Sequence, residues 1–211
     1  MISNEQRKVY EMMDLEMLTN LLLTADQRPD VQRAALSALS KRPPLQRNSK
    51  IILILEYVLK YPDRYNQDVM MSAIDILGTD PGPDATAAML EILPRVLDSA
   101  MKKGDALKPE FRRYFYQTLI TRQRETDMPV WKEMLPTLQP ETLVAALLDP
   151  AAKPLRALEP LTLINRLPAQ ERRQALMSLF VGALQRMNLG LAGKALNLML
   201  SPPHSAKRRR A

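Results

Sequence analysis

The feature that most constrains this sequence is an internal repeat. Residues 68–77 repeat the pattern of residues 30–39, 38 positions further along the chain. Aspartate, valine, alanine and leucine recur at the first, second, sixth and tenth positions of both copies. Self-similarity at a fixed period of about 20 to 50 residues is typical of stacked structural repeats. The sequence therefore predicts an array of similar units.

Within each copy the apolar residues have the spacing of one side of an α-helix. Val31, Ala35 and Leu39 fall at positions i, i+4 and i+8, and so do their counterparts in the second copy. The small alanine in this stripe allows a neighbouring helix to approach closely. Asp30 and Asp68 precede the stripes, where a carboxylate accepts hydrogen bonds from first-turn amides and favours the positive end of the helix dipole. We expect both aspartates to act as helix caps.

A more apolar segment precedes each copy, Leu15–Leu23 before the first and Ile51–Leu59 before the second. The first unit reads Leu18-x-x-Leu21-Leu22, then Asp26, then Pro29-x-Val31-x-Arg33-Ala34-Ala35-x-x-Ala38-Leu39. It resembles the HEAT repeat, and the second unit resembles it with Met71 in place of Arg33. The resemblance implies an α-solenoid, a stack of helical hairpins, and it implies little about function.

The rest of the chain continues the helical pattern less regularly. Phe111, Phe115 and Leu119 repeat the stripe, which predicts a third hairpin over residues 84–123. Prolines crowd the chain from Pro129 onward, so helices there must be short until the long helix predicted from Ala169. We expect an all-α, HEAT-like solenoid of about five hairpins, irregular and proline-rich in its C-terminal half. Residues 1–200 are expected to form a single domain, and residues 201–211 a flexible basic tail.

Three local signals refine these boundaries. Ser3 and Gln6 form a capping box for a first helix that we expect to run to about Thr24. Gly78 is placed for a left-handed helix C-cap, and Pro94 should kink or split its helix.

Thirteen methionines suit either core filling or an adaptable binding surface. We interpret Met70, Met89 and Met177 as core filler, because they lie within apolar patterns. Met12 and Met13, near the N-terminus, are candidates to cover a partner helix.

Composition argues against most catalytic classes. The chain has no cysteine and a single histidine, His204, which lies in the basic tail, so thiolate and histidine metal sites and histidine-based triads are not expected. No glycine-rich phosphate loop is present, and the longest apolar run is far shorter than a membrane helix. We expect a non-enzymatic protein with no cofactor and no bound metal, and a cytoplasmic location.

Charge is distributed unevenly along the chain. Residues 51–100 contain three Lys and Arg against eight Asp and Glu, whereas residues 151–211 contain eleven against two. This asymmetry suggests an anionic partner, or contact between copies through the acidic 51–100 and the basic 151–211 surfaces. The residues predicted to contact a partner are Arg112, Arg113, Arg166, Arg172, Arg173, Arg186, Lys194, Lys207, Arg208, Arg209 and Arg210.

The leading hypothesis is an adaptor or scaffold that binds another protein, its basic C-terminal part docking an acidic surface. The alternative is nucleic-acid binding through the same cations, since each neutralised phosphate releases counterions. HEAT-like alkylpurine DNA glycosylases resemble this chain in size and repeat type, although no catalytic residue carries over. An enzyme that uses only carboxylates and lysines is a third hypothesis.

The nucleic-acid alternative also has candidate stacking residues. They are Trp131, Phe111, Tyr114, Phe115 and Tyr116, with Arg122 and Arg124 nearby. We favour the interpretation that Phe111 and Phe115 belong to the core, with Tyr114 or Tyr116 on the opposite face.

Overall fold

The structure, a computed structural model, describes residues 3–24, 28–42, 49–101, 107–123 and 127–201. In these ranges every regular element is a helix and no strand occurs, so the predicted all-α class is confirmed. The helices are α1 (Asn4–Met12), α2 (Leu15–Leu23), α3 (Pro29–Ser40), α4 (Ser49–Lys60), α5 (Gln67–Thr79), α6 (Pro83–Ser99), α7 (Pro109–Thr121), α8 (Met128–Met134), η3 (Leu135–Thr137), α9 (Pro140–Leu148), η4 (Pro150–Leu158), α10 (Pro160–Arg166), α11 (Ala169–Gln185) and α12 (Leu189–Leu200).

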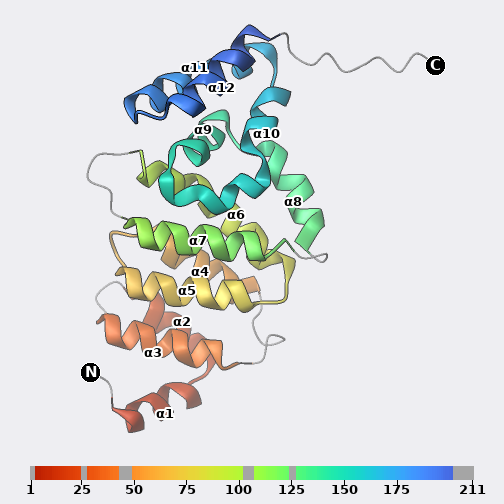
Figure 1. Cartoon of the computed structure of the whole chain (residues 1–211). Coiled ribbons are helices and arrows are strands. Elements are labelled where there is room, and N and C mark those ends of the chain that lie inside the picture. Colours follow the sequence, from red (N-terminus) through yellow and green to blue (C-terminus); the bar gives the residue numbers. More distant parts are fainter. Residues whose placement is uncertain (1–2, 25–27, 43–48, 102–106, 124–126, 202–211) are drawn as a thin grey trace, which may run out of the picture.

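The N-terminal helices form two layers (Figure 1). Helices α3, α5 and α7 pack in turn in one layer, and α2, α4 and α6 pack in turn in the other. Each of α3, α5 and α7 also packs on the preceding helix of the opposite layer, and α1 packs on α3 at the N-terminal end. The predicted stripe Phe111, Phe115 and Leu119 is buried.

The first helix is shorter than predicted. The capping box is confirmed, because Ser3 Oγ accepts from the Gln6 amide at 3.2 Å and Gln6 Oε1 accepts from the Ser3 amide at 3.0 Å. The expected continuous helix to Thr24 is wrong, however. The backbone is extended at Met13 and Asp14, and Asp14 Oδ1 caps a new helix by accepting from the Met17 amide at 2.8 Å.

The predicted caps of the two repeats are wrong by two residues. Helix α3 begins at Pro29 with Arg28 at the N-cap position, and Asp30 lies in its first turn, where its Oδ1 accepts from the Val31 amide at 3.2 Å. Helix α5 is capped by Asn66, whose Oδ1 accepts from the Val69 amide at 2.9 Å, and Asp68 lies in the first turn. The aspartates still favour the positive ends of the helix dipoles.

Gly78 does not end its helix, because α5 continues to Thr79 and Asp80 is its C-cap. A Cβ atom at residue 78 would lie 2.5 Å from Thr118 Cγ2. A side chain at residue 78 would therefore force Thr118 on α7 to shift. Pro94 does not split its helix either, since α6 is a single helix from Pro83 to Ser99.

The C-terminal half contains the predicted short helices followed by two longer ones. Segment η4 packs on α7, α9 packs on α6 and α11, and α12 packs on α11. One hydrophobic cluster extends from Leu18 to Leu158, and a second one joins α9 to α12 between Leu143 and Ala195. None of the helices within the described ranges is long and apolar enough to cross a membrane.

Candidate protein-interaction surface

Arg112 is buried, so it does not belong to the predicted contact surface. Only 5% of the residue is exposed, and its guanidinium donates to Asp149 at 3.0 and 3.4 Å and to the Leu107 carbonyl at 2.6 Å. Asp149 also accepts from the Tyr116 hydroxyl at 3.0 Å. Arg112 thus joins α7 to the start of η4, and the sequence-based role of a surface cation is corrected to a structural one.

Arg172 is corrected in the same way. It is 5% exposed, donates to Asn165 Oδ1 at 2.8 Å, and reaches the carbonyls of Leu198 and, at 3.3 Å, Ser201. These carbonyls lie at the C-terminal end of α12, where a cation is favoured by the helix dipole. Arg172 lies near the N-terminus of α11, where the helix dipole disfavours a cation. Its contacts with the carbonyls at the end of α12 offset this cost.

Five of the predicted cations are exposed. Arg113 lies on α7, away from the others, while Arg166, Arg173, Arg186 and Lys194 lie on or at the ends of α10, α11 and α12. Arg186 Nη2 is 3.3 Å from Met101 Sδ. The remaining candidates, Lys207, Arg208, Arg209 and Arg210, lie outside the described residues.

The aromatic candidates are mostly internal. Phe111, Phe115, Tyr116 and Trp131 are buried, which confirms Phe111 and Phe115 as core residues. Tyr114 is 38% exposed and donates a short hydrogen bond to Asp75 on α5. This bond raises the pKa of the Tyr114 phenol, with burial and the Asp75 charge acting in the same direction.

An exposed apolar surface lies on α11 and α12. We name it the C-terminal end face and define it by six side chains that are 40 to 78% exposed: Met177, Val181, Leu184, Leu189, Leu196 and Leu200. In both helices the members are spaced as on one helical stripe. The interpretation of Met177 as core filler is wrong, whereas Met70 and Met89 are fully buried.

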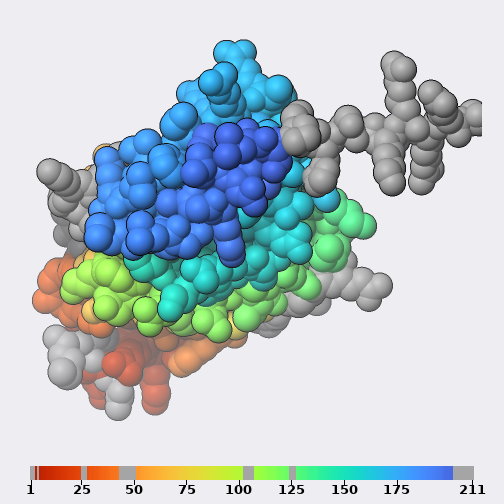
Figure 2. Space-filling view, turned by 45° about the horizontal axis from the view of Figure 1, so that its top comes forward, coloured from red at the N-terminus to blue at the C-terminus, as the bar shows by residue number. Residues whose placement is uncertain are grey.

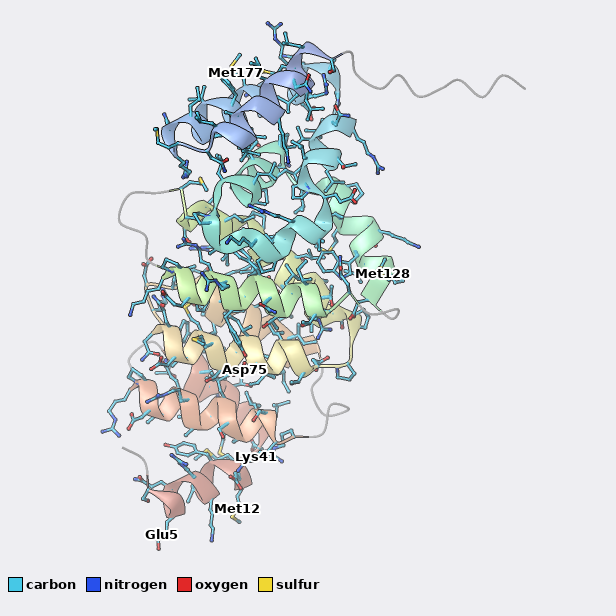
Figure 3. All side chains as sticks on the ribbon, in the orientation of Figure 1. Glu5, Met12, Lys41, Asp75, Met128 and Met177 are labelled. Carbon is cyan, nitrogen blue, oxygen red and sulfur yellow. The ribbon has the colours of Figure 1, made fainter. Side chains whose placement is uncertain are left out.

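The position of this face explains its exposure. Helix α11 packs on α9 and α10, and α12 packs on α11, so this pair closes the stack. Figure 2 shows the two helices side by side on the outer surface of that end, and in Figure 3 Met177 points away from the rest of the molecule. An inner helix such as α5 has a neighbour on both sides, α3 and α7, whereas the pair α11 and α12 leaves one side uncovered.

Arg173 and polar side chains of α11 border the C-terminal end face. Arg173, together with Gln170, Gln174 and Met177, lines a shallow hollow on α11. Lys194 and Arg186 lie on α12 and at the end of α11, and Glu171 is the exposed carboxylate of the two helices. A hydrophobic centre with a charged rim is the usual anatomy of a protein-protein interface. Sequence reasoning found the cations, but it missed the apolar centre because it assigned α11 residues to the core.

Comparisons of the chain with protein-family models, with curated proteins and with solved structures give no match.

Proposed function

We propose that this protein is a non-enzymatic adaptor or scaffold that binds another protein through the C-terminal end face. The observation that carries the proposal is the set of six apolar side chains, 40 to 78% exposed, on the adjacent helices α11 and α12, with Arg173 beside Met177. Exposed apolar patches rimmed by polar residues mark interaction sites in soluble proteins. The cations select a partner with acidic residues around an apolar contact, since charge complementarity favours the right partner.

The stack itself is proposed to be a HEAT-like α-solenoid. The two layers of α2 to α7 support this assignment, and so does the burial of Ala35, Leu39 and the whole second stripe. Stacked hairpins expose long rows of equivalent positions, which suits recognition of an extended partner. The proposal places residues 1–200 in one domain and the protein in the cytoplasm, where a chain without cysteine needs no oxidising compartment.

The experiment is affinity capture of partners with three tagged forms of the protein. Leu196→Asp places a carboxylate in the C-terminal end face, and Leu53→Asp is the matched control, because Leu53 is 63% exposed on α4, outside that face. We expect the wild type and Leu53→Asp to capture the same proteins and Leu196→Asp to lose them. Identical capture by all three forms would contradict the proposal.

The nucleic-acid alternative is supported by the exposure of Arg166, Arg173, Arg186 and Lys194. Fluorescence anisotropy with labelled duplex DNA and RNA at about 50 and about 200 mM salt tests it, because binding to phosphates weakens steeply with salt. A variant ending at Ser201 removes the basic tail. Salt-sensitive binding that survives this truncation would favour nucleic acid over the adaptor function.

A further inference from the structure

A cleft with charged walls lies between α1 and α3, at the N-terminal end of the stack (Figure 1). Arg7 and Glu11 of α1 form one wall, and Asp30, Arg33 and Lys41 of α3 form the other. The cleft has a volume of about 470 Å³. Pockets that hold small molecules have volumes of about 300 to 1,000 Å³. The cleft therefore has room for a small molecule, and not only for a single ion.

Positive charge exceeds negative charge around this cleft. Arg28 bonds to Asp30, Arg42 donates to the carbonyls of Glu11 and Met13 beside it, and Asp68 of α5 lies 3.6 Å from Arg33. With these neighbours included, five cations stand against three acids, namely Arg7, Arg28, Arg33, Lys41 and Arg42 against Glu11, Asp30 and Asp68. The local field therefore favours an anion.

Both carboxylates of the cleft are already paired. Lys41 donates to Glu11, and Arg28 donates to Asp30 at 3.0 Å. Arg7, in contrast, has no ion-pair partner within the described part of the chain. Arg33 has the single contact with Asp68, and both of these side chains are about half exposed or more, so the pair is weak. An incoming anion therefore meets two available guanidinium groups, one on each wall.

Two arginines on facing helices suit a phosphate group. A guanidinium presents a planar fork of N–H donors, and a carboxylate uses both of its oxygens on one such fork. A phosphate ester has three terminal oxygens, so it accepts from two guanidinium groups at once. Ser37 of α3 adds an exposed hydroxyl to the same cleft, and Ala34 and Ala38 keep its floor free of large side chains.

From these observations we infer that the cleft between α1 and α3 binds a small phosphate ester, held by Arg7 from one wall and by Arg33 from the other. The remainder of the ligand lies over the small side chains Ala34 and Ala38. The cleft shares no residue with the C-terminal end face, so this site is independent of the proposed adaptor function.

Binding should also hold α1 more firmly on the stack. Among the described helices, α1 packs extensively on α3 alone. A ligand that bonds to both helices stabilises the packed state of α1 over any opened state, because it binds only when the two walls are together. Amide hydrogen exchange in α1 should therefore slow when the ligand is bound.

Isothermal titration calorimetry of the full chain at about 50 mM salt tests the site. Phenyl phosphate is the probe, and benzoate is the matched carboxylate with the same ring. The variants are Arg7→Gln and Arg33→Gln, with Lys8→Gln as the control, because Lys8 follows Arg7 on α1 and is exposed outside the cleft. Loss of one charge-assisted pair should weaken phenyl phosphate binding at least about tenfold in both arginine variants, while Lys8→Gln stays within about twofold of the wild type.

Several results would overturn the inference. One is the absence of phenyl phosphate binding to the wild type up to about 10 mM. Another is an equal loss in Lys8→Gln and Arg7→Gln, which would show general attraction to positive charge. Benzoate that binds as tightly as phenyl phosphate would contradict recognition of phosphate. A hexaglutamate peptide that binds more tightly than phenyl phosphate would show that the cleft takes an acidic protein segment instead.

Hydrogen exchange gives a second readout on the same samples. Phenyl phosphate should slow amide exchange in α1 of the wild type and of Lys8→Gln, and it should have no such effect in Arg33→Gln, where the altered residue lies on α3. Exchange in α1 that does not respond to phenyl phosphate in the wild type would contradict a ligand held between the two helices. None of these results depends on Leu196→Asp, so the site and the adaptor function stand or fall separately.

Discussion

In the middle of the stack, α5 lies between α3 and α7 and its apolar stripe is fully buried, whereas at the C-terminal end α11 leaves its outer stripe about half exposed. Val69, Ala73 and Leu77 represent the first situation, and Met177 and Val181 the second. Both stripes are apolar, and they differ in whether a neighbouring helix covers them. Neighbouring helices on both sides, rather than composition, decide whether a stripe is core or surface.

The arginines show the same contrast. Arg122, at the end of α7, is 1% exposed, and it donates to Thr86 Oγ1 at 2.7 Å and to the carbonyls of Asp80 and Gly82 at 2.7 Å each. It thereby fixes the connection from α5 to α6. Arg173, on the open end, is exposed. The surface where apolar and basic side chains are exposed together is therefore the candidate binding surface.

The largest expected effect is that of Arg122→Ala. It leaves the buried Asp127 carboxylate, 3.5 Å from Arg122 Nη2, and several carbonyls without their donor. Removing one partner of a buried pair costs about 3–5 kcal/mol. At about 2–4 °C per kcal/mol for a chain of this size, the melting temperature should fall by roughly 6–20 °C.

The control for this change is Arg113→Ala, because Arg113 lies on α7 and is exposed. This substitution should alter the free energy of unfolding by less than about 0.5 kcal/mol. Equal melting temperatures for the two variants would contradict a larger contribution of the buried arginine to stability. Calorimetry measures both.

The next largest loss of stability is expected for Gly78→Ala, which forces a methyl group against Thr118 on α7. Overpacking of this kind costs about 1–3 kcal/mol. Gly182 is buried on α11 against α9, and Gly182→Ala places a Cβ atom 2.5 Å from Leu148 Cδ1. Because this atom is the tip of a longer side chain, the change should cost less. Urea denaturation compares them, and the double variant Gly78→Ala/Thr118→Ala should recover part of the loss. A larger cost at Gly182 would contradict this ordering.

A smaller effect is expected at alkaline pH from Tyr114, which bonds α7 to α5. Because its pKa is raised in the folded protein by the bond to Asp75, its contribution is present below the ordinary phenol pKa of 10.0 and is lost as pH rises through the folded value. The urea midpoint should therefore fall less between about pH 8 and about pH 10.5 for Tyr114→Phe than for the wild type. An identical fall in both would show that the bond does not matter.

The smallest effect on stability is expected from Leu196→Asp. Its side chain is 43% exposed, and surface substitutions change the free energy of unfolding by less than about 0.5 kcal/mol. Near-wild-type thermal unfolding, combined with loss of binding, would separate the C-terminal end face from the core. A large loss of stability would instead show that Leu196 belongs to the core.

Sequence periodicity predicted most of the helices and their apolar sides, although it missed the break between α1 and α2. The stripe from Phe111 to Leu119 and the proline-limited short helices after Pro129 are observed as predicted. These features are local, because they depend on spacing within a helix and on the missing amide of proline.

The candidate site could be predicted only in part, since burial depends on contacts distant in sequence. Arg112 pairs with Asp149, 37 residues away, and Arg172 reaches the end of a helix that follows it. Met177 lies on an apolar pattern but at the end of the stack, which the pattern does not reveal. The exposed cations were found because they are charged, and the apolar face beside them was not.

The most direct measurement is oxidation footprinting of three methionines with hydrogen peroxide, in the presence and absence of a protein captured in the affinity experiment. Met12 lies on α1, Met177 on α11 and Met128 on the side of the stack (Figure 3), and all three are exposed. If the partner covers the C-terminal end face, the oxidation rate of Met177 falls when the partner is added, while the rates of Met12 and Met128 are unchanged. An unchanged oxidation rate at Met177 would contradict binding through this face.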